Sequence, residues 1–279
     1  MNSRPDAFPA QLGPNQDFTG RVVLVTGGTS GIGLAAATAF VEAGASVAIT
    51  GRNLEKGQAV LAQLEELGGQ RGEVLFHRAD VTSEAEVTGL VEAVLARFGR
   101  LHIAVNSAAN VEAAAGTGSL FTDMSLATFE GVVRTCLTSV WLCMKHELVA
   151  ITESGGGSII NVSSIDALMA EPGTGSYAAA KAGVNALSKA AAAEYASQGV
   201  RINVVSPGAV ETPMLAQNLD ASTEEQRTTI RQRYVSNIAA GRLGQPHELA
   251  AAIVWLASDH ASYVVGHNMI VDGGVKGRN

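Results

Sequence analysis

The sequence lacks long apolar runs and an excess of positive charge. No stretch approaches the ~20 uninterrupted apolar residues that a membrane-spanning helix needs, and the first residues do not form the basic and then apolar segments of a signal peptide. The 26 aspartates and glutamates outnumber the 19 lysines and arginines, for a net charge of −7. Nucleic acids and anionic membranes do not attract such a chain without a local basic patch. We therefore expect a cytoplasmic protein that binds neither nucleic acid nor membrane.

Cysteine and clustered histidine are also scarce. Cys136 and Cys143 lie on one expected helix, where a rise of ~1.5 Å per residue separates their Cα atoms by about 10 Å, too far for a disulfide. Both are expected to be buried thiols. The six histidines are scattered without the spacing of metal ligands, so no catalytic metal is expected. Ser163 and Ser164 lack the Gly-x-Ser-x-Gly turn of α/β-hydrolases, which argues against a serine hydrolase.

Short β-branched runs alternate with alanine-rich segments of helical period. Each run is apolar and free of internal proline, as strands buried on both faces are, so we expect a parallel sheet with helices on both sides. Ser83 and Glu86 have the spacing of a capping box, Ser125 is expected to begin a long helix, and Gly99 to end another. The expected strands cover residues 22–26, 46–50, 74–79, 101–106, 158–163, 200–206 and 268–271.

Nothing in the composition divides the sequence into separate domains. A chain of 279 residues could hold one large α/β domain or two small ones, but no flexible linker or long charge run separates its halves. We predict one domain over residues 20–279, preceded by a flexible polar arm over residues 1–19. Residues 211–242 interrupt the alternation of strands and helices, and they are the candidate for a lid over the carboxyl ends of the strands.

A glycine-rich turn follows the first expected strand. Residues 26–33 are Thr-Gly-Gly-Thr-Ser-Gly-Ile-Gly and lead directly into a helix. Glycines allow positive φ and a close backbone approach, so that the N–H groups and dipole of the helix can face a pyrophosphate. A tight turn without a ligand could have a similar sequence, but the position within a β-α-β unit favours a dinucleotide site. The residues expected to bind the cofactor here are Gly27, Thr29, Ser30, Gly31, Ile32 and Gly33.

The end of the second strand bears on the choice between NAD and NADP. Proteins that bind NAD in this way carry an acidic residue there for the ribose hydroxyls. This sequence has Gly51 and then Arg52, whose guanidinium can pair with a phosphate, so NADP(H) is favoured over NAD(H). Arg52 could alternatively be a solvated loop arginine. Asp80 and Val81, after the third strand, are expected beside the adenine, although Asp80 could also cap a helix.

Tyr177 and Lys181 lie four residues apart in an alanine-rich helical segment and therefore share one helix face. A tyrosine with a pKa near ~10 is a poor acid or base at neutral pH, but a nearby ammonium group favours the phenolate and lowers that pKa. A surface pair could have the same spacing. Ser164 stands at the end of a strand and can donate a hydrogen bond to a substrate oxygen as charge develops on it. Together the three residues predict a proton-handling site.

These residues resemble the short-chain dehydrogenase/reductase family, in its compact single-domain branch. The resemblance runs over residues 20–274. It implies an α/β fold with a Rossmann-type, doubly wound sheet of seven parallel strands, an NAD(P) cofactor across their carboxyl ends, and a homotetramer or homodimer. Further motifs follow in the family's order: Asp80, Asn106-Ser107-Ala108-Ala109, Ser206-Pro207-Gly208, Thr212, and Val271-Asp272-Gly273-Gly274.

The resemblance also implies a role for each residue of the proton-handling site. Tyr177 would exchange a proton with the substrate oxygen, Ser164 would orient that oxygen, and Lys181 would hold the nicotinamide ribose and lower the tyrosine pKa. Hydride would pass between the nicotinamide ring and the substrate carbon. Besides Tyr177 and Lys181, cofactor contacts are implied from Asn106, Ala108, Pro207, Gly208, Val210 and Thr212. Substrate contacts are implied from Ala167, Met169, Glu171, Glu211 and Met214, although Glu171 could equally be a solvated carboxylate.

Two positions depart from the family pattern. Many relatives carry an asparagine on the long helix before the catalytic serine, where a main-chain carbonyl binds a water that relays protons to the lysine; this sequence has Cys136 there. A thiol cannot reproduce the contacts of an amide, so we expect a retained but slower reaction, unless Cys136 only packs within the helix. Ala109 replaces the usual glycine of an Asn-Asn-Ala-Gly motif and adds a methyl group beside the expected cofactor path.

The sequence thus predicts an NADP-dependent ketoreductase or secondary alcohol dehydrogenase that acts on a small molecule. A cofactor-binding sensor or scaffold without turnover is the alternative. The intact Ser164, Tyr177 and Lys181 argue against it, whereas Cys136 keeps it open. An epimerase or dehydratase of the family's longer branch is disfavoured by the glycine spacing and by the short segment after Lys181.

Overall fold

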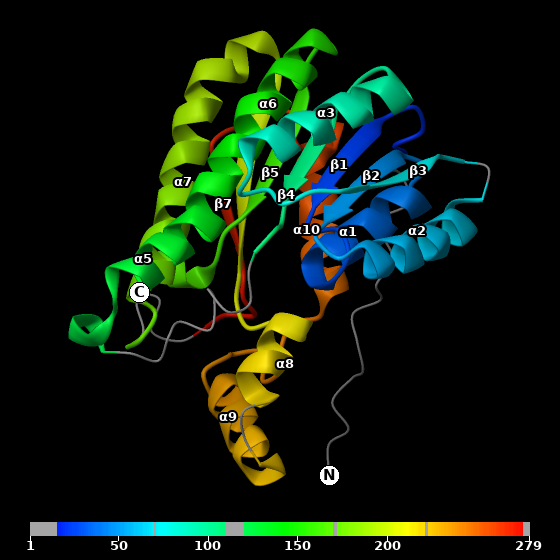
Figure 1. The fold of residues 1–279 in the computed structure, drawn as a ribbon. Helices are drawn as coiled ribbons and strands as arrows, with labels where there is room; N and C mark the ends of the chain where they lie inside the picture. The colour runs from blue at the N-terminus through cyan, green and yellow to red at the C-terminus, as the bar shows by residue number, and fades with distance from the viewer. Residues whose placement is uncertain (1–15, 70, 110–119, 170–171, 221–222, 276–279) are drawn as a thin grey trace.

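Seven parallel strands form one sheet in the computed structural model, which describes residues 16–69, 71–109, 120–169, 172–220 and 223–275 (Figure 1). Their order is β3-β2-β1-β4-β5-β6-β7, so the chain winds outward from β1 in one direction and then from β4 in the other. This is the expected doubly wound sheet. The strands are β1 Val22–Thr26, β2 Ser46–Gly51, β3 Val74–Arg78, β4 Ile103–Asn106, β5 Gly157–Val162, β6 Val200–Pro207 and β7 Asn268–Val271.

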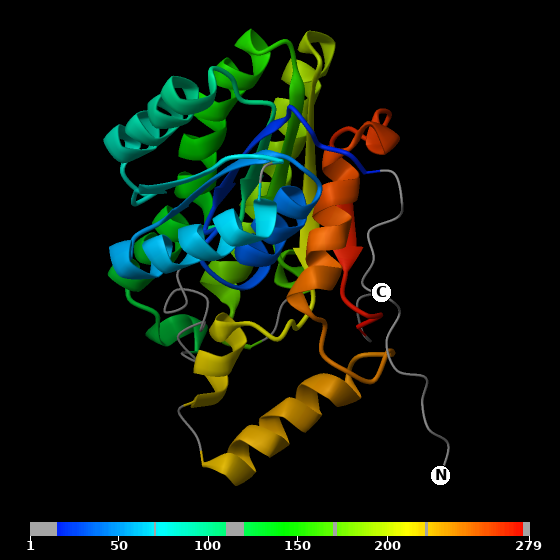
Figure 2. The ribbon, with the colours of Figure 1, turned by 90° about the vertical axis from the view of Figure 1, so that its right-hand side faces the viewer.

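Helices cover both faces of the sheet. Helices α1, α2 and α10 pack on one face, and α3, α6 and α7 pack on the other (Figures 1 and 2). Both faces are therefore buried, as expected for a parallel sheet. The helices are α1 Gly31–Glu42, α2 Leu54–Gly68, α3 Glu84–Phe98, α5 Leu126–Val133, α6 Ser139–Glu153, α7 Gly175–Tyr195, α8 Pro213–Asp220, α9 Glu224–Ser236 and α10 Pro246–Ala257.

Strand β1 shows why the strand sequences are apolar without alternation. Val23 and Val25 belong to the core beneath α1 and α10, whereas Val22 and Leu24 belong to the core beneath α3, α6 and α7. Successive side chains of a strand point to opposite faces, and here each face is covered by helices. Val22, Val23, Leu24 and Val25 are therefore each buried on one face of the sheet or on the other.

Two helix ends lie where the sequence predicts, and one cap is different. The Ser125 side chain accepts a hydrogen bond from the N–H of Thr128 at the start of α5, and Gly99 ends α3 in the left-handed conformation. The predicted capping box of Ser83 and Glu86 is wrong, since Ser83 makes no side-chain bond to the helix.

Glu86 serves the preceding turn instead. Its carboxylate accepts a hydrogen bond of 2.9 Å from the N–H of Asp80. The Asp80 carboxylate accepts hydrogen bonds from the N–H and the hydroxyl of Thr82, at 2.9 and 2.8 Å. This turn brings the Asp80 N–H within reach of Glu86, and that contact competes with the capping box.

Helices α5 and α6 form one long helix with a π-helical turn between them. The turn covers Arg134–Thr138 and contains the buried Cys136. Cys136 and Cys143 are both buried thiols that are not joined in a disulfide, as expected. π-Helical turns within helices are frequent at functional sites, because they change the direction of a few side chains locally.

The packed part of the chain begins before the predicted boundary at residue 20. Phe18 is buried, its ring lies edge-on against Phe40 with 5.1 Å between the ring centres, and its N–H donates to the carbonyl of Ala43. Residues 1–15 of the predicted arm lie outside the described residues.

Helices α8 and α9 follow β6 and lie beyond the carboxyl ends of the strands (Figure 2). Most of the described side chains of α9 are exposed. None of the helices in the described ranges is long and apolar enough to cross a membrane. The segment predicted as a lid therefore contains a helix pair that stands apart from the two main cores.

Candidate active site

A cavity of about 830 Å³ opens at the carboxyl ends of the strands. It is lined by the turns after β1 to β6, by the first part of α7, and by residues of α5, α8 and α9. The point at which the strand order reverses, between β1 and β4, lies within it. Ligands of open α/β sheets bind at this point, and the volume is at the upper end of the range for ligand pockets.

The turn after β1 is shaped for a close backbone approach. Gly27 has a φ of 66°, and a Cβ there would lie 2.8 Å from the Cα of Ala108. A Cβ on Gly33 would lie 2.4 Å from the carbonyl oxygen of Gly27. Helix α1 follows Ser30, whose side chain makes no cap hydrogen bond, so the first N–H groups of the helix remain available to an anion. These residues fit a pyrophosphate.

Positive charge borders the cavity at the end of β2. Arg52 and Lys56 line it, and the Arg78 Nε donates a hydrogen bond of 3.0 Å to the carbonyl of Arg52. A Cβ on Gly51 would lie 2.9 Å from the Oγ1 of Thr29, so a side chain on Gly51 would crowd the glycine turn. This end of the cavity therefore carries two basic side chains and leaves little room for a side chain at Gly51.

Asp80 lies close to the same charges. Burial works against its carboxylate, but hydrogen bonds from Thr82 and the charges of Arg52 and Arg134 outweigh that effect and lower the pKa of Asp80. The group is therefore an anion at neutral pH. It lines the cavity, as does Val81.

The expected proton-handling residues meet at the other end of the cavity. Tyr177 and Lys181 are only 8% and 3% exposed, so they are not a surface pair. The Lys181 Nζ lies 5.8 Å from the centre of the Tyr177 ring and donates a hydrogen bond of 2.8 Å to the Val162 carbonyl. Ser164, just after β5, is buried within hydrogen-bonding reach of the Tyr177 hydroxyl. All three side chains border one space.

Burial dominates the ionisation of this group. It raises the pKa of Tyr177 well above the usual range, negative charge at Cys136 and Asp166 acts in the same direction, and the hydrogen bond with Ser164 opposes them. Burial likewise lowers the pKa of Lys181. The predicted lowering of the tyrosine pKa by Lys181 is not seen: burial raises that pKa, and the Tyr177 phenol is protonated at neutral pH.

Cys136 lies against the proton-handling residues. It packs with Val132, Tyr177 and Ala180 in a small buried cluster. A negative charge on its sulfur raises the pKa of both Tyr177 and Lys181, which reflects the short distance to each. The position at which the sequence departs from the family pattern thus adjoins the site.

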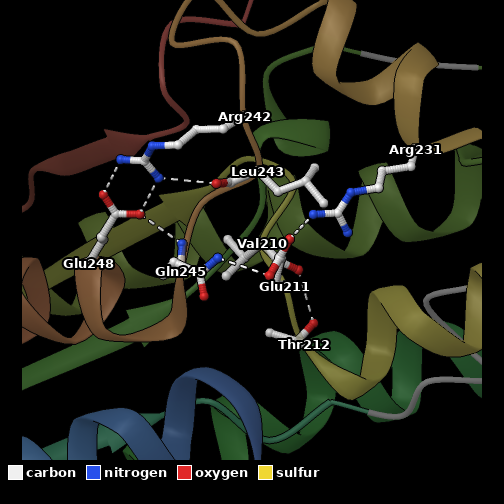
Figure 3. A network of polar contacts seen from close by, with 8 residues as sticks. All are labelled: Val210, Glu211, Thr212, Arg231, Arg242, Leu243, Gln245 and Glu248. Carbon is white, nitrogen blue, oxygen red and sulfur yellow. Dashed lines mark hydrogen bonds and ion pairs between the residues drawn. The ribbon is translucent and has the colours of Figure 1, made fainter. Parts of the chain in front are cut away.

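The loop after β6 is held by a polar network (Figure 3). The Glu211 carboxylate forms an ion pair with Arg231 of α9 and accepts a hydrogen bond of 2.9 Å from the Gln245 Nε2. The Gln245 N–H donates to Glu248 at 2.8 Å, and Glu248 pairs with Arg242 through hydrogen bonds of 2.6 and 2.7 Å. The network connects α9, the loop and the start of α10.

Glu211 itself stands between two residues of the cavity wall. Val210 and Thr212 line the cavity, whereas Glu211 is not among the described residues that do. The hydrogen bond from Gln245 and the pairing with Arg231 lower the pKa of Glu211 against the effect of burial. The carboxylate is thus an anion engaged with α9.

A comparison of the sequence with models of known protein families agrees with this geometry. The model described as enoyl-(acyl carrier protein) reductase, of the short-chain dehydrogenases and reductases, matches residues 27–276. The chain belongs to the short-chain dehydrogenase/reductase family.

Two curated proteins similar to this short-chain dehydrogenase/reductase are named as dehydrogenases of ring alcohols. The 2,5-dichloro-2,5-cyclohexadiene-1,4-diol dehydrogenase of Sphingobium indicum is 39% identical over 92% of this chain and 98% of its own. The cis-4-hydroxycyclohexanecarboxylate dehydrogenase of Sinomonas cyclohexanicum is 40% identical over 92% and 97%. The structure of 7α-hydroxysteroid dehydrogenase with NADH and 7-oxo glycochenodeoxycholic acid has a TM-score of 0.84, with 30% identity over 95% and 98%. The protein is an oxidoreductase of CH–OH and C=O groups that uses a nicotinamide cofactor.

Most of the residues predicted for the site of this short-chain dehydrogenase/reductase line the cavity. All predicted cofactor residues except Gly33 and Asn106 do so, together with Ser164, Met169 and Met214. Gly33 lies beneath the glycine turn, and Asn106 is buried behind it. Ala167, like Glu211, is not among the described residues of the wall. Glu171 lies outside the described residues.

The cavity also contains residues that sequence reasoning missed. Lys56 lies four residues after Arg52, in the first turn of α2, and Arg134 lies three residues after Gly131, so local spacing could have indicated both. Tyr234 and Asn237 come from the end of the α9 segment, where the sequence carries no recognisable signal.

Proposed function

We propose that this protein interconverts ring ketones and secondary alcohols with NADP(H), with Tyr177 as the general acid and base. The observation that carries the proposal is the arrangement along one cavity. Ser164, Tyr177 and Lys181 are buried together at one end, and the glycine turn and Arg52 border the other. A dinucleotide bound along the cavity would be held by the glycine turn and Arg52 at one end and would bring its nicotinamide toward Tyr177 at the other.

In this mechanism Tyr177 supplies the proton for reduction of a ketone. Its phenol is protonated at neutral pH because burial raises its pKa. The Ser164 hydroxyl donates a hydrogen bond to the substrate oxygen as negative charge develops there. Lys181 is fixed beside the phenol by its bond to the Val162 carbonyl. The bound nicotinamide supplies or accepts the hydride.

The preference for NADP(H) rests on the end of β2. Arg52 and Lys56 offer two positive charges to a 2′-phosphate, and a guanidinium can pair with a phosphate through two parallel hydrogen bonds. Gly51 stands where an NAD-binding protein carries its acid, and the contact with Thr29 leaves little room for a side chain. Both observations favour the phosphorylated cofactor.

The ring substrate is inferred from the relatives and from the cavity wall. Both relatives described above are named for substrates with a six-membered carbon ring. Ile165, Met169, Met214 and Leu215 give the substrate end of the cavity an apolar wall that suits such a ring. Asp166 lines the same end, so an uncharged ring is a better match than an anionic one.

A substrate and cofactor screen tests the proposal. The oxidation of NADPH and NADH is followed by absorbance with cyclohexanone, substituted cyclohexanones and open-chain ketones of equal carbon number. We expect kcat/KM to be highest for a ring ketone with NADPH, and Arg52→Ala to lower kcat/KM for NADPH by about tenfold or more without changing it for NADH. A parent enzyme that prefers NADH contradicts the assignment of Arg52.

The catalytic assignment has its own test. Tyr177→Phe removes the hydroxyl, and we expect it to lower turnover by roughly 10²- to 10⁴-fold while the dissociation constant for NADPH stays the same. Tyr195→Phe, at the end of the same helix, is the control and should keep full activity. If the parent binds NADPH tightly but converts no ketone or alcohol, the sensor alternative is favoured.

We also propose that the protein forms a homodimer or homotetramer in the cytoplasm. Helices α5 and α6 expose the large apolar side chains of Phe129, Trp141 and Val149. Most soluble oligomers are symmetric assemblies of one chain, and the contact between copies buries exposed apolar side chains of this kind. The two thiols, which form no disulfide, suit a reducing compartment.

A further inference from the structure

A carboxyl group is buried behind the cofactor end of the cavity. Glu147 of α6 is 1% exposed, and its Oε2 accepts a hydrogen bond of 2.8 Å from the Asn106 Nδ2 at the end of β4. Its Oε1 is also buried and has no hydrogen-bond partner within the described ranges. The proton-handling mechanism does not use this group. A buried polar atom without a partner is costly, so a function should offset the cost.

Among the residues that the structure describes, none places a compensating positive charge beside Glu147. Burial raises its pKa to about 7, and the hydrogen bond from Asn106 opposes this only in part. On α3, which also packs against α6, Glu84 pairs with Lys145 and His146 on the exposed side. The carboxyl group therefore exists in both forms near neutral pH. Asn106 of β4 contacts Glu147 directly, and Asn161 of β5 and Ser188 of α7 follow in the same chain of hydrogen bonds. The thiol of Cys143 lies one helical turn before Glu147 on α6.

Asn106 connects Glu147 to the cofactor turn. Its Oδ1 accepts a hydrogen bond of 3.3 Å from the Thr26 Oγ1, which accepts one of 3.4 Å from the N–H of Ala108. Ala108 lines the cavity and touches Gly27, where a Cβ would come within 2.8 Å of its Cα. Three hydrogen bonds thus separate the Glu147 carboxyl from backbone that borders the glycine turn.

The Asn106 amide is shared between two acceptors. Its Nδ2 donates to Glu147 and also to the Asn161 Oδ1 at 3.0 Å. Asn161 contacts Asn106 only as an acceptor, through its Oδ1. Its own Nδ2 donates to the Ser188 Oγ at 2.8 Å and lies 3.1 Å from the Met144 sulfur. An ionised carboxylate accepts a much stronger hydrogen bond than a neutral one and draws the amide away from its other partners.

We propose that Glu147 is a positioning residue that makes nucleotide binding depend on pH. When Glu147 is neutral, Asn106, Thr26 and Ala108 keep the arrangement that binds the nucleotide. When Glu147 is ionised, its stronger hydrogen bond to the Asn106 amide disturbs that arrangement. A pyrophosphate bound at the turn also favours the neutral form of Glu147, because its negative charge repels a carboxylate behind the turn. Linkage then requires affinity to be highest at low pH and to fall as pH rises and Glu147 ionises. The role depends on the proposed function, since a nucleotide must bind at this turn.

The test measures nucleotide dissociation constants from pH 6 to pH 9 at constant ionic strength, by calorimetric titration of the full chain. NADH is used beside NADPH, because it lacks the 2′-phosphate, whose own ionisation near pH 6 would otherwise contribute. We expect the parent to bind NADH about fivefold more weakly at pH 8.5 than at pH 6. Glu147→Gln has the same shape and cannot ionise, so its affinity should stay near the low-pH value of the parent throughout.

Two further variants complete the experiment. Glu84→Gln removes an exposed carboxylate from α3 and should keep the pH profile of the parent. Glu147→Met replaces the carboxyl by an apolar side chain of similar length and should also give a flat profile, which covers the case in which the glutamine variant does not fold. Infrared difference spectra should contain a protonated carboxyl band at pH 6 that is lost at pH 8.5 in the parent and absent from both variants.

The outcomes separate this role from the proposed function. A flat parent profile, or an equal slope in the parent and both Glu147 variants, overturns the role of Glu147 and leaves the proposed function standing. Absence of NADH and NADPH binding at every pH overturns both.

Discussion

In the proposed mechanism, Tyr177 has to gain and lose a proton from a buried position. Burial disfavours the phenolate and raises its pKa, and Lys181, the nearest cation, is itself easier to deprotonate for the same reason. The protein alone thus holds the phenol in the form that donates a proton. This form serves ketone reduction, whereas alcohol oxidation requires the phenolate.

The two directions should therefore depend on pH differently. For alcohol oxidation we expect kcat/KM to rise continuously from pH 7 to pH 10, because the fraction of phenolate grows toward a raised pKa. For ketone reduction it should stay level over the same range, because the phenol remains protonated below that raised pKa. The two profiles are measured with one alcohol and its ketone under saturating cofactor. An oxidation rate that is already level at pH 7 contradicts the raised pKa.

Cys136 offers a second prediction at the scale of a residue. Its sulfur packs against Tyr177, where an asparagine would bring an amide. In Cys136→Asn we expect turnover to rise by up to about tenfold and the pH profile to shift, because an amide forms stronger hydrogen bonds than a thiol. Cys143→Ser, on the next part of the same long helix, is the control. An unchanged rate and profile would show that the position serves only packing.

At the scale of elements, α9 depends on few contacts. Its described side chains are mostly exposed, so it lacks the apolar face that fixes the other helices to the sheet. The ion pair between Arg231 and Glu211 ties it to the loop that carries Val210 and Thr212. Tyr234 of the same helix lines the cavity, so the ion pair connects this part of the cavity wall to the loop that carries Val210 and Thr212.

This ion pair should affect substrate binding more than the chemical step. We expect Arg231→Met to raise KM for the ketone about two- to fivefold and to leave kcat and the NADPH dissociation constant unchanged. In the parent, KM should also rise with salt, since an exposed pair is screened, and the variant should lose this dependence. Arg233→Met, on the same helix, is the matched control. Equal salt dependence in parent and variant contradicts the assignment.

At the scale of the whole molecule, the apolar surface of α5 and α6 makes a prediction about assembly. Trp141 is 45% exposed, and replacing it by glutamate places a charge in the proposed contact. Light scattering after gel filtration should give a dimer or tetramer for the parent and a smaller species for Trp141→Glu. Leu67→Glu has equal exposure on α2 and should assemble as the parent does. A monomeric parent contradicts the proposal.

The sequence predicts those parts of the molecule that depend on neighbours along the chain. The strands lie within two residues of their expected bounds, since a buried parallel strand needs a continuous apolar run. The glycine turn and the Tyr177–Lys181 pair were also predictable, because a tight turn and a shared helix face follow from local spacing alone.

Contacts between residues that lie far apart in the sequence could not be predicted in this way. Ser83 has the right spacing for a capping box, but Asp80 takes the Glu86 carboxylate once the turn forms. Glu147 and Asn106 are 41 positions apart, and only the packing of α6 on β4 brings them together. The effect of burial on Tyr177 likewise depends on the whole site and not on the nearby lysine alone.

Because of the strand order, each half of the chain supplies a different part of the cavity wall. The glycine turn, Arg52 and Asp80 come from β1 to β3, on one side of the reversal, whereas Ser164, Tyr177 and Met214 follow β5 and β6 on the other. The residues proposed to distinguish NADP from NAD therefore precede those proposed to bind the substrate, while Pro207, Gly208, Val210 and Thr212 of the later half also line the cavity and are proposed to contact the nucleotide. Over evolution, the later half can acquire a new substrate while the earlier half retains its cofactor, and a hybrid that joins halves of two relatives should inherit one specificity from each parent.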